Sequence, residues 1–290
     1  MRKGIKKLLT VALTATLGLA ALAGCGTGTS SNGDGSANGG TTKELSGKIQ
    51  LAGSTSMEKM CGALMEAFME EYPNVTVTTE YTGSGAGIES VTSGAVDTGN
   101  ASRALSDKEK SAGIEENIVA IDGIAMITDK NNKVTNVTKQ QLTDIYTGKI
   151  TNWKEVGGAD EAIVLITRPE SSGTRATFKK YALDGASEAS NKSMETDDSG
   201  VLLQNVKTTK GAIGYVALSY LVSNPGVDTV SIDGVEPTLE NTYAGKYPVW
   251  TYEHMYTKGN ADEVSQKFLD YITSDEYGKK MESLGYGVSS

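Results

Sequence analysis

Three times along the chain, an apolar segment typical of a β-strand runs through a short turn rich in Ser, Thr or Gly into a helical pattern. The three turns are residues 53–56, 82–87 and 168–175. Strands that alternate with helices are typical of α/β folds with mainly parallel sheets, in which such turns gather at the carboxyl ends of the strands. The sequence therefore predicts an α/β fold in which three helix starts lie close together.

The third turn is the richest in hydrogen-bond donors. It reads Arg-Pro-Glu-Ser-Ser-Gly-Thr-Arg over 168–175 and follows the apolar run 163–166. The free N–H groups at a helix N-terminus favour a small anion, and the planar guanidinium of Arg168 fits an oxyanion. Taken alone, the stretch also fits an ordinary helix cap with two solvated arginines. Together with the other two turns, it predicts an anion site of neutral donors with Arg168 as its main charged ligand.

Two further residues stand out because of their surroundings. The apolar positions 57, 60, 61, 64, 65 and 68 have helical spacing, so Cys61 is expected to be a buried free thiol. Asp122 interrupts the apolar run 118–127, and an acid there needs partners. Either Asp122 pairs within the structure or it faces a polar cleft.

Catalytic motifs are scarce. The chain has one histidine, His254, and it has neither a Gly-x-Ser-x-Gly elbow nor the Gly-Lys-Ser/Thr of a nucleotide-binding loop. A Ser-His-Asp enzyme is therefore disfavoured, and a metal site built on several histidines is excluded. The sequence predicts a binding protein that is not an enzyme and uses no cofactor or metal.

The N-terminal segment is typical of an export signal. Four basic residues among residues 2–7 precede an apolar stretch that ends Leu-Ala-Gly-Cys at Cys25. We expect residues 1–24 to be a lipoprotein signal peptide and 25–45 a lipidated Cys25 with a flexible tether, which places the protein outside the cytoplasm on the cell membrane. A conventionally cleaved signal or a short membrane anchor are the alternatives. Without the signal, 23 Lys and Arg face 36 Asp and Glu, a net charge of −13 that argues against a nucleic-acid partner.

Several longer motifs carry a family resemblance. They are Gly-Ser-Thr-Ser-Met at 53–57, Gly-Ser-Gly at 83–85, Leu-Thr-Asp-Ile-Tyr-Thr-Gly-Lys-Ile-Thr-Asn-Trp at 142–153, Arg168 with Ser-Gly-Thr at 172–174, and Gly-Ala-Ile-Gly-Tyr at 211–215. In this set and order, the chain after the tether resembles the phosphate-binding lipoproteins of bacterial ABC phosphate importers, of the Gram-positive type.

The resemblance implies a two-lobed type II periplasmic-binding-protein fold with two crossover strands as a hinge. One lobe would be 46–124 with 250–290, and the other 125–249. The implied function is high-affinity binding of inorganic phosphate between the lobes and its delivery to the permease subunits of an ABC transporter. The alternatives are another oxyanion, such as sulfate or molybdate, and a phosphatase that uses Ser84 or Ser172.

The resemblance also implies the ligands. Glu170, two residues after Arg168, would hold that arginine in place. The phosphate ligands would be Thr55, Ser56, Ser84, Arg168, Ser172, Gly173 and Thr174.

One position departs from the family. Well-known members carry an aspartate after an Ala-Ser pair, and it accepts the proton that phosphate keeps and sulfate lacks. Here Arg103 follows Ala101 and Ser102. We expect Asp122 to take the acceptor role, because a buried carboxylate repels an anion that has no proton. We expect Arg103 to add a second cation, whereas Arg175 is a weaker candidate that equally fits a surface position.

Overall fold

The computed structural model describes residues 44–189, 193–223 and 225–288. The predicted signal peptide and Cys25 lie outside the described residues. Within those ranges, none of the helices combines the length and apolar character needed to cross a membrane.

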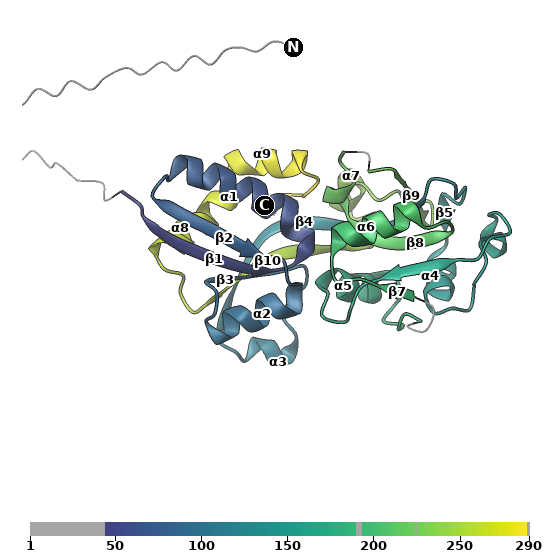
Figure 1. Cartoon of the computed structure of the whole chain (residues 1–290), viewed down its shortest axis with the longest axis horizontal. Helices are drawn as coiled ribbons and strands as arrows, with labels where there is room; N and C mark the ends of the chain where they lie inside the picture. The colour runs from purple at the N-terminus through teal and green to yellow at the C-terminus, as the bar shows by residue number, and fades with distance from the viewer. Residues whose placement is uncertain (1–43, 190–192, 224, 289–290) are drawn as a thin grey trace, which may run out of the picture. The chain divides into compact units, whose positions relative to one another are not determined.

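The described strands and helices alternate along most of the chain (Figure 1). The strands are β1 (Gly47–Gly53), β2 (Val75–Glu80), β3 (Thr98–Ala101), β4 (Ile114–Asp129), β5 (Asn136–Val137), β6 (Val164–Thr167), β7 (Ser193–Glu195), β8 (Ala212–Ala217), β9 (Val227–Ile232) and β10 (Trp250–Lys258). The helices are α1 (Glu58–Glu71), α2 (Ser84–Ser93), α3 (Asp107–Lys110), α4 (Lys139–Tyr146), α5 (Gly173–Tyr181), α6 (Ser199–Thr208), α7 (Leu239–Tyr243), α8 (Glu263–Ile272) and α9 (Asp275–Ser283), with 3-10 turns η1 (Thr55–Met57), η2 (Trp153–Val156) and η4 (Leu218–Tyr220).

One continuous path of strands runs in the order β2-β1-β3-β10-β4-β8-β6-β7, with β9 paired to β4 and β5. The pairs of β1 with β2 and β3, and of β6 with β7 and β8, are parallel, as predicted. The strands β4 and β10 run antiparallel to their neighbours in the middle of the path. The sheet is therefore parallel at both ends and antiparallel in the centre.

The two central strands cross between the two ends of the sheet. The first part of β4, up to Gly123, pairs with β10, and the part from Ile124 pairs with β8, whereas β9 pairs with β4 from Met126. The buried apolar residues follow the same division. One core cluster contains residues from β1, β2, α1, α8 and α9, and the others gather around β6, β8, α4, α5 and α6, with one smaller cluster beneath α2.

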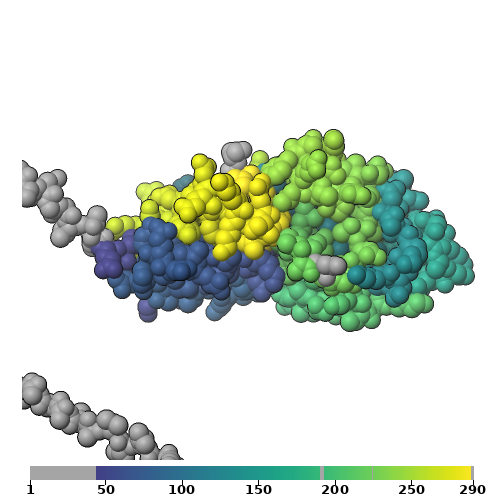
Figure 2. Space-filling view, turned by 90° about the horizontal axis from the view of Figure 1, so that it is seen from above, coloured from purple at the N-terminus to yellow at the C-terminus, as the bar shows by residue number. Residues whose placement is uncertain are grey.

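The first core joins distant parts of the sequence. In α1, Met60, Cys61, Leu64 and Phe68 face inward, and Phe268 of α8 meets Phe68 edge to face with ring centroids 5.1 Å apart. Figure 2 shows the C-terminal residues in yellow against the early residues in blue. Cys61 is a buried free thiol, which confirms the prediction from the helical spacing.

Candidate functional site

The three turns predicted to gather at one point meet in the structure. Arg168 donates from Nη2 to Thr55 Oγ1 at 3.1 Å, and the backbone N–H of Gly85 donates to the carbonyl of Ser171 at 3.0 Å. The six predicted ligands with a side chain are each at most 2% exposed: Thr55, Ser56, Ser84, Arg168, Ser172 and Thr174. We call these six residues and the buried Gly173 the cage.

The start of α5 lies very close to Ser84 at the start of α2 and to Ser102 after β3. A Cβ added at Gly173 would lie 2.3 Å from Ser84 Oγ and 3.1 Å from the backbone carbonyl carbon of Ser102. One turn further on, Thr177 donates to the carbonyl of Ser102 at 3.1 Å. A side chain at position 173 therefore requires Ser84 or the start of α5 to shift.

Arg168 is the charged centre of the cage. Its Nη1 donates to Ser199 Oγ at 2.8 Å, its Nη2 also donates to the carbonyl of Asp197 at 2.6 Å, and its Nε has no hydrogen-bond partner among the described residues. Within those residues, no carboxylate lies within salt-bridge distance of this guanidinium. Burial lowers the pKa of Arg168, and Tyr215 and Asp198 oppose that shift. Since an arginine pKa lies so high, the group keeps its charge.

Glu170 does not hold Arg168, and that prediction is wrong. The Glu170 side chain is 87% exposed and its nearest cation is Arg175, at 3.8 Å. The guanidinium of Arg168 instead reaches inward toward Thr55, away from the exposed turn that carries Glu170.

Arg175 holds the main chain of the turn that carries Arg168. Its Nη1 donates to the backbone carbonyl of Arg168 at 2.5 Å, and its Nε lies 3.3 Å from Glu188 Oε2. The Arg175 side chain is only 12% exposed, so it is not the surface arginine that the sequence also allowed. Arg175 thus fixes the main chain of the turn, whereas Arg168 presents its side chain to the cage.

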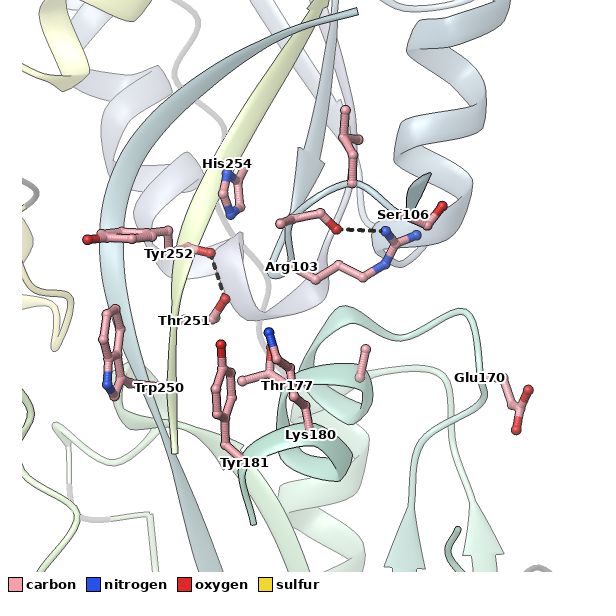
Figure 3. Close-up of a pocket in the computed structure, with 13 residues that line it drawn as sticks. Arg103, Ser106, Glu170, Thr177, Lys180, Tyr181, Trp250, Thr251, Tyr252 and His254 are labelled. Carbon is pink, nitrogen blue, oxygen red and sulfur yellow. Dashed lines mark hydrogen bonds between the residues drawn. The ribbon is translucent and has the colours of Figure 1, made fainter. Parts of the chain in front are cut away.

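Arg103 does not provide a second cation to the cage. Its Nη1 and Nη2 both donate to the Glu109 carboxylate at 2.8 Å, and Glu109 belongs to the capping box that begins with Ser106. The Arg103 side chain lines a cavity of about 520 Å³ together with Trp250, Tyr252 and His254 (Figure 3). That expectation is therefore wrong, because the cation is already neutralised locally by Glu109.

The carboxyl group that faces the cage belongs to Glu253 and not to Asp122. Ser56 Oγ donates to Glu253 Oε1 at 3.1 Å, and Ser102 also hydrogen-bonds to the Glu253 carboxylate. Asp122 is fully buried, but its carboxyl group contacts Glu253 and not a cage hydroxyl. The expectation that Asp122 is the acid in contact with the cage is thus corrected, because among the described residues Ser56 hydrogen-bonds to Glu253 and no cage hydroxyl hydrogen-bonds to Asp122.

The two acids influence one another strongly. Burial raises the pKa of Asp122 well above its usual value, and the neighbouring Glu253 raises it further. Burial raises the pKa of Glu253 to about 7, while hydrogen bonds from Asp122, Ser102 and Ser56 lower it. The two acids therefore titrate as a coupled pair, in which simultaneous ionisation of both carboxyl groups is disfavoured.

Sequence reasoning missed four residues at the cage, namely Ser54, Ser102, Ser199 and Glu253. Ser54 Oγ and Ser102 Oγ are 2.5 Å apart, Ser102 also hydrogen-bonds to Ser56, and Ser199 Oγ lies 2.8 Å from Thr55 Oγ1. Two signals could have found some of them. Asp198 and Ser199 stand at the start of α6, which adds a fourth helix start to the three that were predicted. Glu253, like Asp122, is an acid within a predicted strand.

Loss of the proton of Glu188 should make the fold less stable as the pH rises. Burial raises the pKa of Glu188 from 4.5 to about 7, against the attraction of Arg175. The folded state then holds a proton that the unfolded chain releases, so stability falls between pH 4.5 and 7, by up to about 3 kcal/mol. We expect Glu188→Gln to remove this part of the decline in the free energy of unfolding, measured by urea denaturation at several pH values.

The matched control for Glu188 is Glu195→Gln. Glu195 contacts the same arginine at 3.5 Å, but its side chain is 56% exposed. The Glu195→Gln substitution should leave the decline of the free energy of unfolding with pH unchanged. If Glu195→Gln reduced this decline as much as Glu188→Gln, the burial of Glu188 would not be its cause.

In the ranges that the structure describes, no group of three or more His, Cys, Asp or Glu side chains could hold a metal ion. The cage instead offers hydroxyls, backbone N–H groups and one guanidinium, which suit an oxyanion.

Comparisons with known proteins agree with this arrangement. Residues 33–276 match the PBP superfamily domain. The chain is 40% identical over 279 residues to the phosphate-binding protein PstS of Bacillus subtilis (strain 168), which covers 95% of this chain and 91% of that protein.

Solved structures are similar in fold and sequence. A phosphate ABC transporter substrate-binding protein from Clostridium perfringens, described as putative and solved with bound phosphate, has a TM-score of 0.80 at 38% identity and covers 84% of this chain and 100% of its own. An ABC-type phosphate transport receptor from Vibrio cholerae has a TM-score of 0.69 at 28% identity, over 83% and 100%. The α/β class and the two-lobed type II fold are confirmed. The chain therefore belongs to the PBP superfamily and, within it, to the family of the PstS phosphate-binding proteins.

Proposed function

We propose that the chain binds inorganic phosphate in the cage and delivers it to the permease of an ABC importer. The observation that carries the proposal is the buried Arg168, which has no carboxylate partner among the described residues and is surrounded by hydroxyls and helix starts. A buried cation is costly unless an opposite charge joins it. An anion with several acceptor oxygens satisfies Arg168 and the cage hydroxyls together.

The names of the relatives support phosphate as that anion. The Bacillus subtilis relative is named a phosphate-binding protein, and the Clostridium perfringens structure contains bound phosphate. The proteins are described as transport components, which supports binding and release without chemistry at the ligand.

Closure of two lobes around the anion accounts for the burial of the cage. The proposed lobes are 46–124 with 250–290, and 125–249. The separation of the core cluster around β1 and α1 from the clusters around β6 and β8, and the two crossing strands β4 and β10, support this division. Opening at these strands would separate Gly173 from Ser84 and Arg168 from Thr55, and so would admit and release the ligand.

The proposed location is the outer face of the cell membrane. The export signal that ends at Cys25 supports a lipid anchor there, and the Gly- and Ser-rich residues that follow support a tether. The folded part would then meet the permease at the membrane surface.

Isothermal titration of the purified protein with phosphate, sulfate and molybdate tests the proposal. We expect micromolar or tighter binding of phosphate at neutral pH and at least tenfold weaker binding of the other two anions. A preference for sulfate or molybdate would contradict phosphate as the ligand and would mean that this fold binds another oxyanion. Turnover of a phosphomonoester would contradict a pure binding function.

A further inference from the structure

Two fully buried carboxyl groups lie next to each other on the two crossing strands. Asp122 of β4 is paired with Thr251 of β10, and Glu253 of β10 is paired with Ala120 of β4, so the two acids are diagonal neighbours. A β-bulge directly after Glu253 changes the register of β10 at this point. Such bulges often re-aim a side chain next to a functional site. We call Asp122 and Glu253 the carboxyl pair.

The groups around the carboxyl pair are uncharged. Glu253 meets the hydroxyls of Ser56 and Ser102 and influences the thiol of Cys61 on α1. The phenol of Tyr286 and the backbone N–H of Leu218 in η4 act on Asp122. Neither acid forms a salt bridge in the described part of the chain.

Two like charges this close cannot both ionise in a buried and uncharged environment. Both oxygens of Asp122, and Oε2 of Glu253, also lack a regular hydrogen bond among the described residues. One proton between the two carboxyl groups resolves both problems, because a protonated carboxyl becomes a donor. With this proton on Asp122, Glu253 presents a carboxylate to the cage.

A carboxylate at Glu253 can only accept a hydrogen bond. It therefore selects an oxyanion that brings an O–H group, as phosphate does, and repels sulfate, which has none near neutral pH. Once Glu253 itself is protonated, it can donate to a bare oxyanion oxygen and the repulsion disappears.

We infer that the carboxyl pair holds one proton at neutral pH, and that uptake of a second proton by Glu253 opens the cage to fully deprotonated oxyanions such as sulfate. The inference rests on the proposed anion-binding function. The choice of anion would then depend on pH through Asp122 and Glu253, which lie on the two crossing strands beside the cage.

Sulfate is the appropriate probe, because its own ionisation does not change between pH 5.5 and pH 8.5. We expect the affinity of the wild-type protein for sulfate, measured by isothermal titration, to rise at least tenfold from pH 8.5 to pH 5.5. In Glu253→Gln the amide donates at every pH, so sulfate affinity should become nearly independent of pH and phosphate binding at pH 8.5 should weaken at least tenfold.

Two further variants test the pairing. Asp122→Asn removes the neighbouring acid and gives Glu253 an amide donor, so the rise in sulfate affinity should move to a lower pH. His254→Gln is the matched control, because His254 is the next residue on β10 and is also ionisable, but its ring lines the cavity with Arg103 and contacts Glu116. This control should keep the wild-type pH dependence.

A sulfate affinity of the wild-type protein that is constant from pH 5.5 to pH 8.5 would overturn the inference. The same would follow if Glu253→Gln kept the wild-type pH dependence, or if His254→Gln abolished it. The wild-type series needs no substitution, so it decides the matter even if a variant does not fold. Failure of the proposed function has a different signature, namely no binding of phosphate by the wild-type protein at neutral pH.

Discussion

Replacing Arg168 by alanine should weaken phosphate binding at least tenfold, which corresponds to about 1.4 kcal/mol or more of binding free energy. Arg168 is the only cation that the described structure places in the cage, and its guanidinium is almost fully buried. Hydrogen bonds between charged partners in such an environment are worth more than neutral ones. Isothermal titration with phosphate measures the loss, and urea denaturation shows whether the fold is retained.

The matched control is Arg103→Ala. Arg103 is also partly buried and lies next to Ser102, but its guanidinium is engaged by Glu109. Its removal should change phosphate affinity less than about threefold, as expected for a partly exposed ion pair outside the cage. If Arg168→Ala lost less than tenfold, backbone N–H groups and hydroxyls would dominate binding. If Arg103→Ala lost as much as Arg168→Ala, the position of Arg103 outside the cage would be contradicted.

Replacing Gly173 by alanine should weaken phosphate binding at least tenfold for a steric reason. The new Cβ would lie 2.3 Å from Ser84 Oγ and 3.1 Å from the carbonyl carbon of Ser102, so Ser84 or the start of α5 would have to move. Since overpacking of this kind costs about 1–3 kcal/mol, the closed arrangement should become less populated. Isothermal titration measures the lost affinity. Separation of the two sides relieves the clash, so we expect the free energy of unfolding without ligand to change by less than about 1 kcal/mol.

Gly62→Ala provides the control for this substitution. Gly62 lies inside α1, and a Cβ there would have no neighbouring atom within 4 Å. Alanine in a helix should stabilise the fold by about 0.5–1 kcal/mol and leave phosphate affinity unchanged. Equal affinities of Gly173→Ala and the wild-type protein would contradict the close approach of α5 to Ser84.

The helix starts of the cage could be predicted because their signals are local. Ser172 caps α5 by accepting from the backbone N–H of Arg175, and the apolar spacing of α1 specifies its inward face. The same local signals placed Cys61 in the core. The family resemblance then identified which of these turns belong together.

The errors arose where the partner lies far away in the sequence or where two partners compete. Glu170 is close in sequence to both Arg168 and Arg175, and only the direction of the side chains decides between them. Arg103 is neutralised by Glu109, which a search for the capping box that begins at Ser106 could have suggested. The contact of Glu253 with Ser56 depends on the register of β10, which no local pattern specifies.

The discontinuous first core has a consequence for the order in which the chain folds. Ile49 and Leu64 share this core with Phe268, Met281 and Tyr286, which come from the end of the chain. As the polypeptide is made from its N-terminus, the apolar surface of the early strands cannot be covered until these late residues are present. The segment from Ile124 to Val249 contains the other large core clusters within itself and can be completed earlier. This arrangement favours assembly that begins in the middle of the chain and is completed when the last helices cover the first core.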